Sequence, residues 1–134
     1  MKSLFDTSDN NEIVARVNRL TANAKGEWGK MSVDQMLVHT QRPLKVAFGE
    51  LKLKRTLIGF LFGGMAKKKL RSDEPWKKNL LTDKNFIVKE HYNVDDEKKN
   101  LMALVQRFGQ AGPNGISKAP HPFFGALTPQ EWDV

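Results

Sequence analysis

The chain has 134 residues, of which 40% are hydrophobic and 28% are charged, and its formal net charge is +7, which together predict one globular domain with a sizeable core. The absence of cysteine excludes disulfides, thiol nucleophiles and thiolate metal sites, so a bound metal would need His, Asp or Glu. The start lacks the apolar run of a signal peptide, and the longest apolar run, residues 57–66, is shorter than the roughly 20 residues that span a bilayer. We therefore expect a single cytoplasmic domain over residues 1–134.

A first amphipathic helix is predicted after the short lead-in. Apolar residues with helical spacing follow Ser8 and Asp9, either of which can cap the helix. Phe5 is placed to pack just before this cap, and the helix is expected to end near residues 23–26. Trp28, in the connection that follows, is expected to cover one end of a helical bundle.

The second predicted helix has the clearest signals in the chain. Ser32 and Gln35 form a capping box at its start, and Gly49 ends it. Pro43 lies inside this helix and cannot donate an N–H to the carbonyl of His39. A kink is therefore expected one turn after the only histidine of a predicted helix.

Residues 51–78 contain nine basic and two acidic residues, which accounts for the whole net charge. We expect a basic insert of one or two short amphipathic helices whose lysines point to solvent. The apolar residues expected to face the bundle are Leu57, Ile58, Leu61, Phe62 and Met65. The candidate anion-binding residues of the insert are Lys52, Lys54, Arg55, Lys67, Lys68, Lys69, Arg71, Lys77 and Lys78.

The basic insert is compatible with three interpretations: binding to nucleic acid, binding to an anionic membrane, and a solvated helix face. Clustered lysines bind nucleic acid or an anionic membrane by releasing counterions, and Trp76 offers one stacking group. A lysine-rich solvated helix face is commonplace, and no nucleic-acid-binding motif accompanies it. A solvated face is therefore favoured over nucleic acid or a membrane as partner.

The second half of the chain is predicted to contain one long helix between irregular segments. Residues 72–88 read as a loop, and Val94-Asp-Asp-Glu97 opens a helix with acidic residues in its first turn, where the helix dipole favours them. Residues 109–113 end this helix. Residues 112–126 form a Gly- and Pro-rich coil.

The last segment contains the start signals of a helix, but the sequence ends two residues after Trp132. Thr128 is a good cap, Pro129 suits the first helical position, and Glu131 completes a capping box before the apolar Trp132. We therefore expect a C-terminally incomplete domain, with an apolar groove between the three long helices. A homodimer or the basic insert is expected to fill this groove.

The motif His121-Pro-Phe-Phe-Gly125 could be mistaken for a catalytic loop. Its structural interpretation is favoured: Phe123 and Phe124 close one end of the bundle, Gly125 takes a special backbone dihedral, and the imidazole makes a local hydrogen bond.

Four segments together resemble the DinB-like superfamily, in its branch of small bacterial proteins. They are the lead-in Lys-Ser-Leu-Phe-Asp6, residues 28–39, the insert with Lys-Lys-Asn79, and residues 121–132. The resemblance implies an all-α four-helix bundle with one long crossover. In many members it also implies a divalent metal held by three histidines.

The resemblance carries one metal ligand to this chain, His39. The family's other two ligands lie on the last helix, beyond the position of Trp132, and His91 and His121 lack helical spacing to His39. Complete relatives would hold Zn or Ni, whereas a weak site or none is expected here. The resemblance thus suggests a metal-dependent hydrolase or thiol-transferase scaffold with an incomplete site. The alternative is a non-catalytic binding protein that uses the basic face of residues 52–78.

Overall fold

The computed structural model describes residues 2–70, 72, 74, 77, 78, 80 and 83–133. Regular structure in these residues is helical, without strands, which confirms the all-α prediction. The helices are α1 (Thr7–Asn18), α2 (Val33–Ala47), α3 (Leu57–Leu70), α4 (Val94–Ala111) and α5 (Pro129–Trp132), with short 3-10 turns at Lys84–Phe86 and Pro113–Gly115. Among the described residues, none of these helices has both the length and the apolar character needed to cross a membrane.

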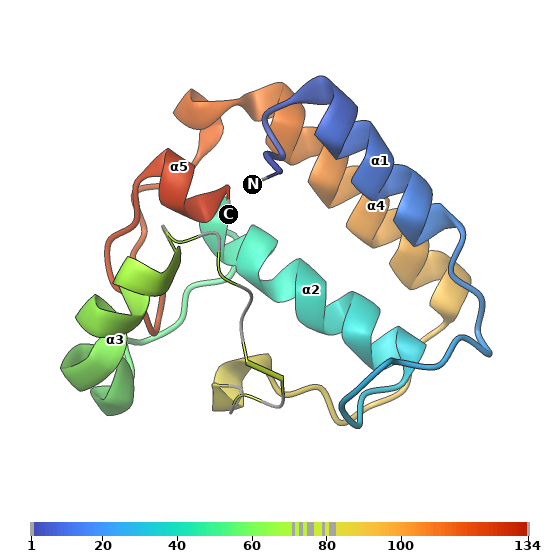
Figure 1. Ribbon diagram of the computed structural model, residues 1–134, viewed down its shortest axis with the longest axis horizontal. Helices are drawn as coiled ribbons and strands as arrows, with labels where there is room; N and C mark the ends of the chain where they lie inside the picture. Colours follow the sequence, from blue (N-terminus) through green and yellow to red (C-terminus); the bar gives the residue numbers. More distant parts are fainter. Residues whose placement is uncertain are drawn as a thin grey trace.

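Helix α4 organises the packing, because both α1 and α2 contact it (Figure 1). Its residue Phe108 is fully buried, stacks on Phe5 with ring centroids 4.9 Å apart, and meets the edge of Phe48 at 6.1 Å. The buried residues of this hydrophobic core are Val17, Val33, Leu37, Leu44, Ala47, Leu101, Leu104, Val105 and Phe108.

The first helix begins and ends earlier than the sequence predicted. Its cap is Asp6, whose carboxylate accepts the Asp9 backbone N–H at 3.0 Å. Asp9 does not cap the helix, because its own carboxylate accepts the backbone N–H of Ser3 at 2.9 Å. The helix ends at Asn18, and Trp28 is 54% exposed, so the expectation that it covers the bundle end was wrong.

The boundaries of α2 and α4 are confirmed. Gln35 Oε1 accepts the Ser32 backbone N–H at 3.2 Å, and Gly49 follows the end of α2 with a φ of 73°. Asn93 caps α4 by accepting the Asp96 backbone N–H at 3.0 Å, and Gly112, with a φ of 61°, ends it.

The short helix α5 ties the two ends of the chain together. The predicted capping box is present, since Thr128 Oγ1 accepts the Glu131 backbone N–H at 3.2 Å and Glu131 Oε2 accepts that of Thr128 at 2.9 Å. Just after it, the Asp133 carboxylate accepts the Ser3 hydroxyl and the Leu4 backbone N–H, both at 2.6 Å. These bonds join positions 129 and 130 residues apart in sequence.

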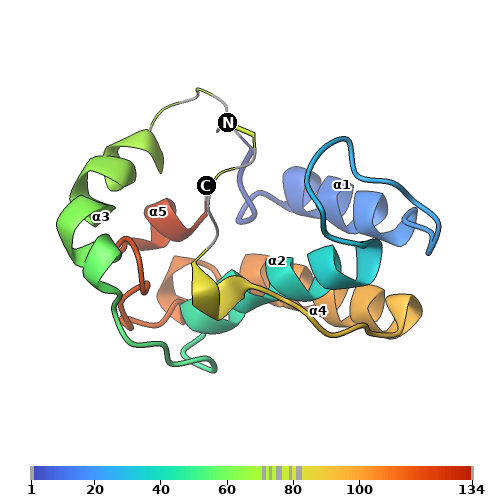
Figure 2. The same cartoon turned by 90° about the horizontal axis from the view of Figure 1, so that it is seen from below.

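Helix α3 stands apart from the packing of α1, α2 and α4, and α5 lies between it and them (Figures 1 and 2). It contacts the segment after Pro122 with its two buried glycines, Gly59 and Gly63. The expectation that its large apolar residues face the bundle was therefore wrong. Those residues are exposed: Leu57, Ile58, Leu61, Phe62 and Met65.

The glycines face inward because the backbones approach too closely for a side chain. A Cβ on Gly63 would lie 2.3 Å from the carbonyl oxygen of Phe123, and one on Gly59 would lie 2.7 Å from the same atom. The Thr56 backbone N–H also donates to the Pro122 carbonyl at 3.1 Å. These contacts fix which face of α3 points away from the protein.

Replacing Gly63 by alanine is expected to loosen the contact of α3 with Phe123. The new methyl overpacks the contact at a cost of about 1–3 kcal/mol, against about 1 kcal/mol gained in helix propensity. Hydrogen exchange of the α3 amides should therefore become faster. Gly64→Ala is the matched control, because a Cβ there meets nothing within 4 Å, and its α3 amides should exchange more slowly. Equal exchange in the two variants would contradict this account.

Candidate functional site

His39 lies half-buried on α2, against the loop that precedes α4. Its Nδ1 is 2.9 Å from the carbonyl oxygen of Phe86, and the two rings meet edge to face at 6.5 Å. A carbonyl only accepts, so Nδ1 carries the proton and donates. Of the two neutral tautomers, this bond selects the one with an unprotonated Nε2, as in many metal-ligating histidines.

His121 is buried at the start of a tight turn. The backbone N–H groups of His121 and Gly125 donate to each other's carbonyl oxygens at 2.9 and 3.0 Å. Gly125 has a φ of 76°, which confirms the special backbone dihedral predicted at this position. The imidazole Nδ1 accepts the backbone N–H groups of Phe123 and Phe124 at 3.1 and 3.3 Å, so the predicted local hydrogen bonding is confirmed.

Aromatic rings surround the His121 imidazole. The centroids of Phe86, Phe124 and Trp132 lie 5.6, 4.8 and 5.4 Å from its own. Burial lowers the pKa of His121 to about 4, although the charge of Asp83 opposes this shift. The ring is thus neutral at pH 7, with Nδ1 already occupied by backbone donors.

His91 belongs to a third and separate network, centred on the buried Asp34. Asp34 Oδ2 accepts the Nδ1–H of His91 and the backbone N–H of Tyr92, both at 2.9 Å, and the Ser32 hydroxyl donates to Oδ1. These bonds tie the start of α2 to the segment that leads into α4. No sequence pattern predicted this role of Asp34, because Asp34 and His91 are 57 residues apart in the chain.

The three histidines do not make a metal site together. The His121 Nδ1 accepts backbone N–H groups and the His91 Nδ1 donates to Asp34. Within the described residues, no group of three or more His, Asp or Glu side chains is arranged to hold a metal ion. His39 and His91 both donate from Nδ1, but they lie in separate networks, so these residues do not fit a three-histidine centre.

Replacing Asp34 by asparagine is expected to weaken the acid dependence of stability. The Ser32 hydroxyl and the Tyr92 backbone N–H, with His91, hold the pKa of Asp34 well below its usual range. A lowered folded-state pKa contributes stability above the ordinary value of about 3.9, and this contribution is lost as the pH falls below it. Urea unfolding of wild type and Asp34→Asn at pH values from about 7 to about 2.5, on both sides of the ordinary carboxylate pKa, would measure this difference. An unchanged acid slope in the variant would contradict it.

The basic residues of the insert fall into two groups. Lys67 Nζ lies 2.9 Å from Glu131 Oε2 and donates to the Ala126 carbonyl at 2.6 Å, while Lys69 pairs with Glu74. Arg71 lies outside the described residues, as does Trp76. Six others are exposed, and we call them the basic surface: Lys52, Lys54, Arg55, Lys68, Lys77 and Lys78.

The apolar side chains of α3 lie between Lys52, Lys54 and Arg55 of this basic surface, which precede the helix, and Lys68 in its last turn. Leu57 is 76% exposed and Phe60 is 68% exposed, and the Arg55 guanidinium lies 5.3 Å from the centre of the Phe60 ring. We call the six large exposed residues the apolar face of α3: Leu57, Ile58, Phe60, Leu61, Phe62 and Met65. Hydrophobic periodicity did not predict this face. The signal was the spacing of Gly59 and Gly63, which places both glycines on one side of the helix.

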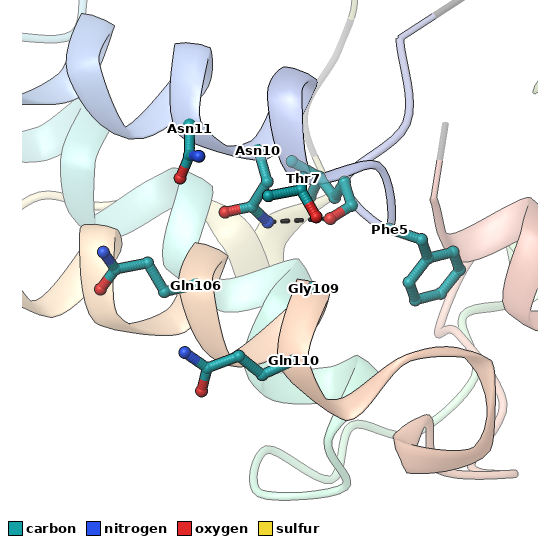
Figure 3. A pocket seen from close by; sticks show the side chains of 8 residues that line it. Phe5, Thr7, Asn10, Asn11, Gln106, Gly109 and Gln110 are labelled. Atoms are coloured by element: carbon teal, nitrogen blue, oxygen red, sulfur yellow. Dashed lines mark hydrogen bonds between the residues drawn. The ribbon is translucent and has the colours of Figure 1, made fainter.

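A shallow depression of about 210 Å³ lies between α1 and α4 (Figure 3). Amides line it from both helices, with Asn10 and Asn11 on α1 and Gln106 and Gln110 on α4. Asn10 is held in place, since its Nδ2 donates to the Leu4 and Val105 carbonyls at 2.8 Å. None of the residues that line it is ionisable at neutral pH, so it offers no general acid or base.

Comparisons of the chain with protein-family models, with curated proteins and with solved structures find no match, so the case for a function rests on these residues.

Proposed function

We propose that this chain is a non-catalytic binding protein that recognises an anionic partner through its basic surface. The observation that carries the proposal is the exposed positive charge around α3. The sequence from residue 51 to residue 72 contains seven basic residues and no acidic one. Lys52, Lys54 and Arg55 before the helix and Lys68 near its end are all exposed. Clustered exposed cations bind polyanions by releasing counterions.

Retention on immobilised heparin tests this proposal. Neutralising Lys52, Lys54 and Lys68 to glutamine should lower the salt concentration at which the protein elutes, because three counterion-releasing contacts are lost. The matched control neutralises Arg16, Lys25 and Lys30, which are exposed and lie elsewhere on the molecule. Both triple variants have the same net charge. Equal losses of retention in the two would show that only overall charge matters and would contradict the proposal.

A second candidate function has one observation in its favour. The resemblance of residues 28–39 and 121–132 to DinB-like proteins suggests a metal-dependent hydrolase or thiol-transferase scaffold, built as a four-helix bundle. The hydrogen bond from His39 to the Phe86 carbonyl orients the imidazole as a ligand would be oriented. Homodimerisation through an apolar groove between the long helices remains part of this candidate. Sedimentation velocity would test it.

Isothermal titration with Zn²⁺ or Ni²⁺ separates the two candidates. We expect weak binding, because a catalytic zinc site needs three protein ligands and the described residues contain no group of three that could hold a metal ion. His91→Ala is the control variant, since that imidazole bonds to Asp34. Tight 1:1 binding that is lost in His39→Ala and kept in His91→Ala would favour the metal-dependent scaffold instead.

A further inference from the structure

The apolar face of α3 is large, contiguous and directed away from the protein. Its six side chains are between 50% and 76% exposed and all belong to one stretch of nine residues. Monomeric water-soluble proteins rarely expose such a patch unless it binds something. The direction of the face is fixed, because Gly59 and Gly63 hold the opposite side of the helix against Phe123.

Positive charge brackets this apolar face along the helix. Lys52, Lys54 and Arg55 precede α3, and Lys67, Lys68 and Lys69 occupy its last turn. The Lys67–Glu131 ion pair, at 2.9 Å, fastens that end of the helix to the protein. A partner that covers the face must therefore offer apolar volume with negative charge at its border.

A bilayer that contains anionic lipids has this chemistry. Apolar side chains enter the boundary between headgroups and acyl chains, while lysines reach the headgroups. Helix α3 has 14 residues and is about 21 Å long, shorter than a hydrocarbon core of about 30 Å. It can therefore lie along the surface but cannot span it.

We propose that α3 docks the protein on anionic membranes, lying parallel to the surface with its apolar face in the lipid. The proposal rests on the proposed function and names its partner. An isolated interfacial helix needs a polar face of its own. In α3 the side opposite the apolar face carries glycines instead of polar residues, and it packs on residues 122–124 of the protein.

Two other partners suit the surface less well. A nucleic acid would use the lysines and leave the apolar face in water. A second copy would bring the basic surface of one molecule against that of another, and like charges repel. The sequence favoured a solvated face because lysine-rich helix faces are commonplace. The expected inward packing of Leu57, Ile58, Leu61, Phe62 and Met65 is absent, so the insert exposes apolar side chains as well as lysines.

Binding to vesicles of phosphatidylcholine, with and without phosphatidylserine, tests the docking. Wild type should sediment with the phosphatidylserine vesicles only. Ile58→Gln together with Leu61→Gln should weaken binding about 100-fold, because two side chains lose their burial in lipid. Neutralising Lys52, Lys54 and Lys68 should weaken it by a similar factor.

The matched control for the apolar variant is Trp28→Gln. Trp28 is 54% exposed but lies in the connection between α1 and α2, so its loss should leave vesicle binding unchanged. Ile58 and Leu61 are 64% and 61% exposed, so their replacement should leave the far-ultraviolet circular dichroism unchanged. Equal losses in the Trp28 and Ile58/Leu61 variants would overturn a specific role for α3.

A single dye reports whether the face enters the lipid, because the chain has no cysteine. A nitrobenzoxadiazole label on Leu61→Cys should brighten and shift to the blue on phosphatidylserine vesicles. The same label on Asn11→Cys, on α1, should not. Vesicle binding without a response from the label at 61 would mean adsorption by charge alone and would overturn the insertion.

The outcomes separate this inference from the proposed function. Heparin retention without vesicle binding would overturn the membrane docking and leave an anionic partner in solution. A dimer in sedimentation velocity that is lost in the Ile58/Leu61 variant would assign the face to a second copy. Neither heparin retention nor vesicle binding beyond that of the charge-matched control would overturn both proposals.

Discussion

Replacing Phe108 by alanine is expected to lower the free energy of unfolding by about 3–5 kcal/mol. The ring is fully buried at the contact of α4 with α2 and the lead-in, where it stacks on Phe5 and meets Phe48. Alanine would lose the buried apolar area and leave a cavity that rigid neighbours fill only in part. Urea denaturation followed by circular dichroism measures the change.

The matched control is Phe60→Ala on α3. Phe60 is 68% exposed, so the same truncation should change the unfolding free energy by less than about 0.5 kcal/mol. The two variants therefore separate a structural phenylalanine from one that faces outward. A loss in Phe60→Ala comparable with that in Phe108→Ala would mean that Phe60 is buried in solution, which would also remove the apolar face of α3.

Acidification from pH 6.5 to pH 4 is expected to cost the fold about 3 kcal/mol through His121, since each unit of pKa shift corresponds to about 1.36 kcal/mol. Burial lowers the pKa of His121 to about 4, from an ordinary value of 6.5. Between pH 6.5 and pH 4, His121 therefore binds a proton in the unfolded chain but not in the folded chain. Stability is retained above pH 6.5 and falls as the pH drops through this window. Protonation of Nδ1 would also remove the acceptor of the hydrogen bonds from the backbone N–H groups of Phe123 and Phe124.

His121→Asn tests this assignment, because the asparagine carbonyl can accept the same backbone N–H groups without titrating. Its stability should vary less than that of wild type between pH 6.5 and 4. In the wild-type protein, the His121 ring resonances should titrate near pH 4. Asp83→Asn should move that midpoint lower, since the Asp83 charge favours the protonated ring. A midpoint near 6.5 would contradict the assignment.

The sequence predicted those parts of the fold in which local signals and packing agree. The capping boxes of Ser32 and Thr128, and the glycines that end α2 and α4, act within one turn of the residue that carries them. The cap of α1 was misplaced because Asp9 makes a competing bond to Ser3. Such competition depends on how the lead-in folds back, which spacing along a helix does not encode.

The outward direction of α3 could not be predicted from hydrophobicity. An apolar helix is normally assigned to a core, and six large side chains outweigh two glycines in any such assignment. What decides the direction here is the approach of the Phe123 backbone, 60 residues or more along the chain, which leaves no room for a Cβ at Gly59 or Gly63. The i, i+4 spacing of the two glycines is the signal that such a contact leaves in the sequence, and it is weaker than the hydrophobic pattern.

The sequence predicted some residues of the candidate site, but it did not predict how they are arranged. His39 and His121 were singled out, and the local hydrogen bonding of His121 was correctly anticipated. The sequence did not reveal that His91 pairs with Asp34, or that Lys67 pairs with the buried Glu131. Both pairs depend on long-range packing, and they decide which charged groups remain exposed to a partner.

The carboxylate of Asp133 has a consequence for the order in which the molecule assembles. Ser3 and Leu4 find their hydrogen-bond acceptor only when residue 133 has been synthesised, long after α1 itself has emerged from the ribosome. Closing so long a loop is entropically costly and is expected late in folding. We therefore expect the contacts among α1, α2 and α4 to form before the lead-in is fastened, and Phe5 to reach its final place against Phe108 late in folding.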